Sequence, residues 1–392
     1  MSRLQDRLLA PETLRLALLV ISPYILYKAT RGVLAASNPA KPPIYTAPRA
    51  LATKDLPYPP DCLPGSRDVD TPYGTIRVYE WGPEDGRKVL FVHGISTPCI
   101  AFAGLAKRLV ESEGCRVMLF DLFGRGYSDA PDPATYQQDL RLWTSQILLV
   151  LGSSELDWMS DGFALVGYSM GGGIGAAFTT YFPRLVRSLV LIAPAGLMRP
   201  SHVHGTSKLI YGGFMPAGLV TWAIRKRLSS RQPEKTEGTT PAQTAKSEHP
   251  AHMPDSSAAL FADRPGISVA EAVGWQVDAH PGFVPAFVSS IQHAPISGQH
   301  ARWRLVGARC AAQRVGGEGE GRLAEGKVLV LPGSTDNVIV TKEIVEDAGE
   351  ALGKENVRIE VLEGGHDLPI VNAEGCARVI ADFWSQPLVS SS

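Results

Sequence analysis

Short apolar runs alternate with segments of helical periodicity from residue 75 onward. Apolar runs of this length predict strands, and strands that are apolar on both faces are typical of a parallel sheet covered by helices on both sides. The predicted strands are residues 75–81, 88–93, 116–120, 163–167 and 187–193, and the predicted helices between them are residues 101–110, 136–151 and 170–182. The sequence therefore predicts an α/β protein with a mostly parallel, doubly wound sheet.

This alternation is interrupted in the middle of the chain. It resumes with predicted strands at residues 327–332 and 357–362 and closes with a helix at residues 374–384. In the interruption, residues 219–228 and 283–291 have helical patterns, and Phe283, Phe287 and Ile291 fall on one helix face. We therefore expect a core formed by residues 69–196 and 327–388, with an inserted helical cap at residues 197–326. Residues 229–257 contain no Val, Ile, Leu, Phe, Trp or Tyr, so within the cap they are expected to be a disordered insert.

The N-terminal part of the chain has a different composition. Residues 37–68 contain eight prolines, which favours a linker or a surface strap. Before them, residues 16–27 are uncharged and are flanked by Arg15 and Lys28. A helix of that length spans about 18 Å, less than a bilayer requires. We expect residues 1–36 to form an apolar helix that contacts a membrane through residues 14–30. The protein would then be intracellular and attached to the membrane. The alternatives are a signal peptide and a helix packed on the core.

Charge and cysteine content exclude several classes of function. The 38 basic side chains nearly balance the 39 acidic ones, so the chain lacks the basic surface that nucleic-acid binding requires. The five cysteines are odd in number and widely spaced, with no zinc-like pattern. We expect free buried thiols, no bound metal ion and no cofactor.

A serine in a sharp turn is the strongest chemical signal. The segment Gly167-Tyr168-Ser169-Met170-Gly171 follows a predicted strand and precedes a helix rich in small residues. This is the G-x-S-x-G nucleophile elbow, in which the glycines let neighbouring backbone approach the serine. Ser169 is therefore the predicted nucleophile.

A serine hydroxyl needs a base, and the base needs an orienting acid. His366 follows the last predicted strand, and Asp336 follows the strand before it. The chain order Ser169, Asp336, His366 is the order known for this arrangement. Asp367 is the alternative acid, but adjacent side chains do not face each other. The other histidines lie in the predicted cap or in low-complexity sequence, apart from His93.

Two backbone N–H groups are the candidates for stabilising an oxyanion. His93-Gly94-Ile95 follows a predicted strand, so the N–H of Ile95 joins that of Met170, the residue after the nucleophile. His93 is then structural. Asp121 begins the segment DLFGRGYSD, whose glycines indicate a turn that braces this loop.

With these motifs the chain resembles the α/β-hydrolase superfamily. HG, DLFGRGYSD, GYSMGG, the Asp336 loop and GGHD occur in order at predicted strand ends. The resemblance to capped esterases, monoglyceride-lipase-like enzymes and carbon-carbon bond hydrolases implies a serine hydrolase that cleaves an ester-like or ketonic bond of a small apolar or lipid-like substrate. Epoxide hydrolases and haloalkane dehalogenases carry aspartate where Ser169 stands.

Other functions remain open at this stage. A carbon-carbon bond hydrolase, a transacylase and a cofactor-free haloperoxidase would use the same triad, and a membrane-docked binding protein would use none of it. Aromatic residues of the cap are candidates for lining an apolar acyl pocket, although plain packing is the alternative. These residues are Tyr211, Phe214, Trp222, Trp275 and Phe287.

Overall fold

The computed structural model describes most of the predicted core and part of the cap. The described residues are 43–49, 56–199, 218–220, 222, 257–261, 264, 266–314 and 323–385. The predicted N-terminal helix at residues 1–36, and all but the last residue of the predicted insert 229–257, lie outside them. Within the described ranges, no helix has the length and apolarity needed to cross a membrane.

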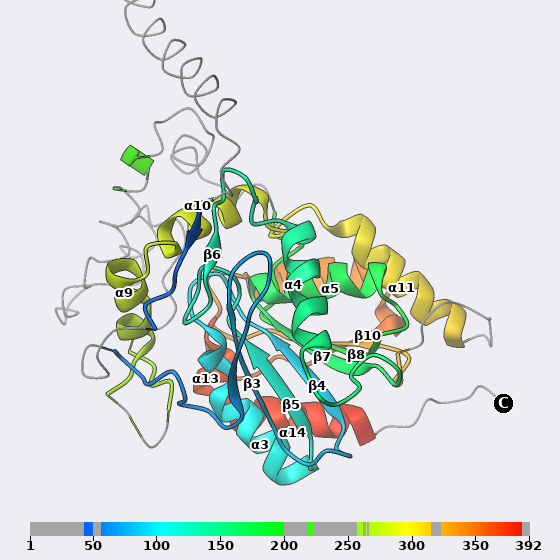
Figure 1. Ribbon diagram of the computed structural model, residues 1–392. Coiled ribbons are helices and arrows are strands. Elements are labelled where there is room, and N and C mark those ends of the chain that lie inside the picture. Colours follow the sequence, from blue (N-terminus) through cyan, green and yellow to red (C-terminus); the bar gives the residue numbers. More distant parts are fainter. Residues whose placement is uncertain are drawn as a thin grey trace, which may run out of the picture. The chain divides into compact units, whose positions relative to one another are not determined.

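An eight-stranded sheet forms the centre of the molecule, in the order β10-β9-β8-β7-β4-β5-β3-β2 (Figure 1). All neighbours from β10 to β5 are parallel, whereas β3 runs antiparallel to β5 and β2 runs antiparallel to β3. The mostly parallel sheet is therefore confirmed. The strands are β2 (Ser66–Val69), β3 (Ile76–Trp81), β4 (Lys88–Val92), β5 (Arg116–Phe120), β7 (Phe163–Tyr168), β8 (Val186–Ile192), β9 (Val328–Leu331) and β10 (Val357–Ile359).

β3 runs opposite to the other strands of this mostly parallel sheet. Only residues 82–87 connect β3 to β4. A parallel crossover needs a dozen or more residues, so this short connection forces β3 to run in the opposite direction. β2 pairs with the other edge of β3, to which residues 70–75 connect it.

Helices cover both faces of the sheet, and each face has its own hydrophobic core. Along β4, Val89 and Phe91 belong to the same core cluster as buried residues of α3 and α14, while Leu90 and Val92 belong to the cluster that includes buried residues of α4, α5, α11 and α12. Figure 1 shows these two layers on opposite sides of the sheet. The helices are α3 (Ala103–Glu113), α4 (Leu140–Gly152), α5 (Met170–Tyr181), α11 (His300–Arg314), α12 (Thr341–Leu352), α13 (Leu368–Val371) and α14 (Ala373–Ser385), with short 3-10 helices η2 (Cys99–Phe102) and η4 (Lys354–Asn356).

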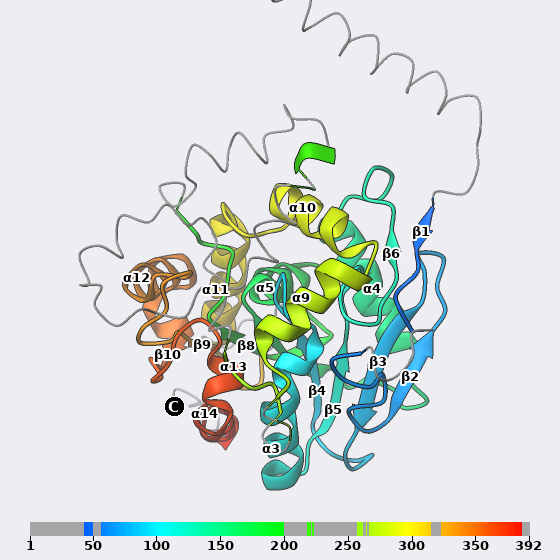
Figure 2. The ribbon, with the colours of Figure 1, turned by 90° about the vertical axis from the view of Figure 1, so that its left-hand side faces the viewer.

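Two described cap helices pack on the core, α9 (Val269–Ala279) and α10 (Phe283–His293) (Figure 2). The predicted face of α10 is observed, with Phe283 and Phe287 buried and Ile291 partly buried. α9 begins at a capping box in which Ser268 and Glu271 each accept from the backbone N–H of the other. Residues 300–314, also within the predicted cap range, form α11, whose buried Trp303 and Val306 belong to the core beside α5 and α12.

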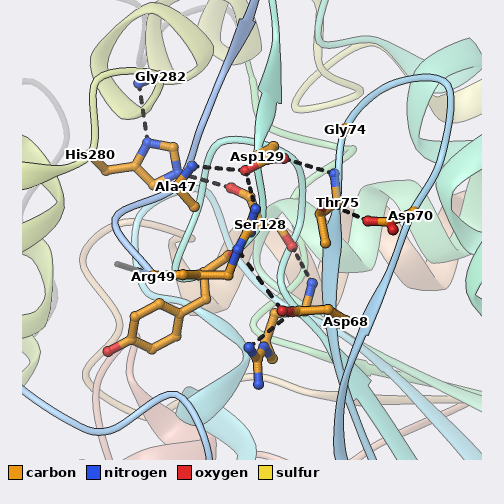
Figure 3. A network of polar contacts seen from close by, with 12 residues as sticks. Ala47, Arg49, Asp68, Asp70, Gly74, Thr75, Ser128, Asp129, His280 and Gly282 are labelled. Carbon is orange, nitrogen blue, oxygen red and sulfur yellow. Dashed lines mark hydrogen bonds and ion pairs between the residues drawn. The ribbon is translucent and has the colours of Figure 1, made fainter. Parts of the chain in front are cut away.

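Asp129 fastens the described part of the Pro-rich range to the core. In that range, residues 43–49 contain β1 (Ile44–Tyr45), which pairs with β6 (Ala130–Pro131). Asp129 Oδ1 accepts from the backbone N–H of Ala47 at 2.8 Å and from Arg49 Nη2 at 2.7 Å. Its Oδ2 accepts from the N–H of Thr75 at 2.8 Å (Figure 3). Residues 44–49 thus lie against the core as a strap.

Ser128, the neighbour of Asp129 in sequence, joins the core to the cap through His280. His280 Nδ1 lies 3.1 Å from the backbone N–H of Gly282 and therefore accepts, so the proton is on Nε2, which donates to the carbonyl of Ser128 at 2.9 Å (Figure 3). Burial lowers the pKa of His280 to about 4. The imidazole is therefore neutral. Protonation of Nδ1 would break the hydrogen bond that it accepts from Gly282.

Acid is expected to weaken the fold through this histidine. An unfolded histidine has a pKa near 6.5, so between pH 6.5 and about 4 the unfolded chain binds a proton that the folded chain excludes. At pH 5 this costs about 2 kcal/mol of the free energy of unfolding relative to pH 7.5. Urea unfolding of the wild type and of His280→Gln at both pH values measures it. An equal loss in both proteins would contradict the assignment.

Candidate active site

Ser169 stands between β7 and α5 in a strained backbone conformation. Its φ of 52° and ψ of −121° lie outside the ordinary regions for a side-chain-bearing residue. The elbow closes because the flanking positions lack side chains: a Cβ on Gly171 would lie 1.9 Å from the carbonyl oxygen of Val92, and one on Gly167 would lie 2.5 Å from that of Gly171. A side chain at either glycine of the motif would therefore collide with a backbone carbonyl group.

The structure brings Ser169, His366 and Asp336 together in one hydrogen-bonded chain. His366 Nε2 lies 2.9 Å from Ser169 Oγ, and His366 Nδ1 lies 2.9 Å from Asp336 Oδ2. Because a carboxylate only accepts, the imidazole proton is assigned to Nδ1, which leaves Nε2 to accept from the serine hydroxyl. This is the arrangement in which a histidine can take a proton from a serine.

Asp336 is held rigidly in its orienting position. Its other oxygen, Oδ1, accepts from the backbone N–H groups of Val338 and Ile339, each at 2.8 Å. The side chain is fully buried and that of His366 is 8% exposed. With both of its oxygens engaged, the carboxylate has one orientation relative to the imidazole.

Asp367, the alternative acid, faces a different partner. Its Oδ1 accepts from the hydroxyl of Tyr168 at 2.7 Å, and the Tyr168 ring packs 5.4 Å from the His366 ring. This pair is not among the sequence predictions, although Tyr168 directly precedes the serine and Asp367 directly follows the histidine. The contact joins the elbow to the loop that carries the imidazole.

Three further described histidines do not belong to the triad. His280 joins the cap to the core, and His293 and His300 are at the end of α10 and the start of α11. The other four, His202, His204, His249 and His252, lie outside the described residues.

The 93–96 loop lies directly against the serine, since a Cβ on Gly94 would be 3.3 Å from Ser169 Cβ. His93 Nε2 accepts from the N–H of Leu122 at 2.8 Å, so its Nδ1 carries the proton and donates to the carbonyl of Gly94 at 2.8 Å. Burial lowers the pKa of His93 to about 3, which keeps it neutral. This bond fixes the peptide that carries the Ile95 N–H, and Met170 N–H is one of the first-turn groups of α5 without a partner inside the helix.

Asp121 braces the neighbouring loops through its carboxylate. Its Oδ1 accepts from the N–H of Cys99 and its Oδ2 from that of Tyr127, both at 2.9 Å. Burial raises its pKa. The side chain therefore holds two chain segments together.

The aromatic cap candidates divide into packed and exposed residues. Trp275 packs its ring against Tyr58 and Tyr127, with centroids 5.9 and 5.2 Å away, and Phe287 is buried beside Phe283. Trp222 is 59% exposed. Tyr211 and Phe214 lie outside the described residues.

Comparison with known proteins places the chain beside hydrolases. A family model described as "Alpha/beta hydrolase family" matches residues 89–379. A serine hydrolase-like protein of Danio rerio is 30% identical over 131 residues, which are 33% of this chain and 38% of that protein. The 2-hydroxymuconate semialdehyde hydrolase of Pseudomonas sp. (strain CF600) is 34% identical over 116 residues, or 29% and 39%. The matched regions thus span less than two fifths of these relatives.

A solved structure extends the likeness to the whole fold. The putative lipase of Acinetobacter baumannii AYE superposes with a TM-score of 0.56 at 14% identity, covering 81% of this chain and 90% of that one. At this identity the likeness concerns architecture alone.

Gly171→Ala is expected to lower the free energy of unfolding by about 3 kcal/mol or more, because the new methyl group would overlap the carbonyl of Val92. Gly274→Ala is the matched control: this helix position has open space, and alanine should raise stability by up to about 1 kcal/mol. Thermal and urea unfolding measure both. Equal stability of the two variants would contradict the close approach.

Proposed function

The chain belongs to the α/β hydrolase family, and on this premise we propose that it is a serine hydrolase acting on an ester-like bond of a small apolar or lipid-like molecule. The observation that carries the proposal is the chain of two 2.9 Å hydrogen bonds from Ser169 through His366 to Asp336. The 30% identical relative named as a serine hydrolase-like protein supports it.

The proposed mechanism uses the side chains and backbone of the site together with a water molecule. His366 Nε2 accepts the proton of Ser169 as Oγ attacks the substrate carbonyl, and Asp336 stabilises the resulting imidazolium. The oxyanion of the tetrahedral intermediate accepts from the N–H groups of Ile95 and Met170. The imidazolium then protonates the leaving alcohol, which departs and leaves an acyl group on Oγ. Water, activated by the same imidazole, releases the acid.

A second candidate is cleavage of a carbon-carbon bond. It is favoured by the relative that is 34% identical and is named 2-hydroxymuconate semialdehyde hydrolase. Product analysis with p-nitrophenyl esters of increasing acyl length and with a vinylogous 1,5-diketone distinguishes the two. Ester turnover without diketone cleavage supports the first function, and the length preference reports the depth of the acyl pocket.

A fluorophosphonate probe is expected to label the wild type at Ser169. Activated by His366, the serine oxygen attacks phosphorus and forms a stable adduct that mass spectrometry can locate. Ser169→Ala should lose the label, whereas Ser112→Ala, on the surface of α3, should keep it. An unlabelled wild type, or equal labelling of Ser169→Ala, would refute the serine mechanism.

Asp336→Asn is expected to lower kcat by about 10³- to 10⁴-fold, because an amide in this position favours the wrong imidazole tautomer. The fold should persist, since the amide oxygen can still accept from Val338 and Ile339. Asp367→Asn, whose carboxylate is bonded to Tyr168, should cost far less. Ester kinetics on both variants measure this, and a larger loss in Asp367→Asn would make that residue the orienting acid.

A further inference from the structure

Three successive carbonyl oxygens of the 93–96 loop are each held by a side chain from a different part of the chain. His93 Nδ1 donates to Gly94 O at 2.8 Å, Arg125 Nε donates to Ile95 O at 3.0 Å, and Gln276 Nε2 donates to Ser96 O at 3.0 Å. The donors are His93 of the loop itself, Arg125 of the loop after β5 and Gln276 of the cap helix α9. The loop is therefore fixed peptide by peptide.

Arg125 is the charged member of this set, and it is fully buried. Its Nη1 donates to Phe123 O at 2.9 Å and to Gln138 Oε1 at 3.3 Å, and its Nη2 donates to Ser290 Oγ of α10 at 2.7 Å. Within the described part of the chain, these hydrogen bonds all end on neutral oxygens. Burying a guanidinium among such partners lowers the stability of the fold, because no carboxylate among them offsets the loss of hydration of the charge.

The positive charge acts on the groups around the loop. Burial lowers the pKa of Arg125 to about 9, so the guanidinium stays charged at neutral pH. Burial, and after it the charge of Arg125, lowers the pKa of His93. The cation therefore acts on the loop beside Ser169, to which it is also hydrogen-bonded.

We propose that Arg125 is a positioning residue for the proposed hydrolysis: it locks the 93–96 loop to α10, so that the Ile95 N–H is preorganised, and its charge favours the oxyanion. The inference rests on the proposed function. Negative charge develops only as the tetrahedral intermediate forms, so the loss should appear in kcat and not in KM. A residue that merely joined the cap to the core would alter stability or substrate binding instead.

The test compares Arg125→Met with Arg116→Met in the full-length protein. Arg116 is the matched control: it bonds Glu80 Oε1 at 3.1 Å and Gly82 O at 2.7 Å at the opposite end of β5, so its loss should lower stability without touching the loop. With a p-nitrophenyl ester, Arg125→Met should lower kcat by about 10- to 100-fold with KM within about threefold of the wild type. The rate of fluorophosphonate labelling should fall in parallel, and Arg116→Met should keep both rates.

Two milder variants decide the question if Arg125→Met does not fold. Arg125→Lys keeps the charge but has one donor group for four acceptors, so kcat should fall at least about fivefold. Ser290→Ala frees the guanidinium from α10 alone and should lower kcat about threefold. Wild-type kcat in both, or an equal kcat loss in Arg116→Met, would overturn the inference. A wild type with no ester cleavage and no labelling would instead refute the proposed function, and the inference with it.

Discussion

The close approach of α5 to the end of β4 is the contact on which the site depends. It requires a glycine at position 171, and it forces the chain to turn at Ser169 within a single residue. The strained turn is held from several sides: the Ser169 N–H donates to Ile192 O at 3.0 Å, and its carbonyl accepts from the N–H groups of Gly172 and Ala195, each at 2.9 Å. These backbone hydrogen bonds thus hold Ser169 in its strained conformation and offset the free energy that the strain costs.

The parallel sheet assembles the rest of the site. The segments that carry Ser169, Asp336 and His366 follow β7, β9 and β10, so all three leave the sheet at its carboxyl edge, where open α/β sheets place their ligands. The last two segments also contact each other through backbone, since the N–H of Thr335 donates to Gly364 O at 3.0 Å. Main-chain contact therefore holds the loops that carry Asp336 and His366 beside each other.

The features predicted from the sequence are those that local chemistry determines. Apolar runs such as residues 116–120 are strands, and Ser169, Asp336 and His366, chosen for their places after strands, converge. The antiparallel β3 depends on the length of a connection, and β2 is a short polar edge strand that no apolar pattern marks. The bond from Arg125 to Ser290 joins positions 165 residues apart, and nothing in either segment alone indicates it. Contacts of this kind depend on tertiary packing.

Two of the three hydrogen bonds of the Gln276 side chain, those that leave α9, constrain how a substrate can enter. Its Nε2 holds the carbonyl of Ser96, while its Oε1 accepts from the N–H of Gly126 at 2.8 Å. If α9 swung outward, both backbone groups would lose their partner, and the loop beside the nucleophile would relax at the moment of admission. We therefore expect α9 to stay in place during substrate binding, and the substrate to enter by a route that does not require this helix to move.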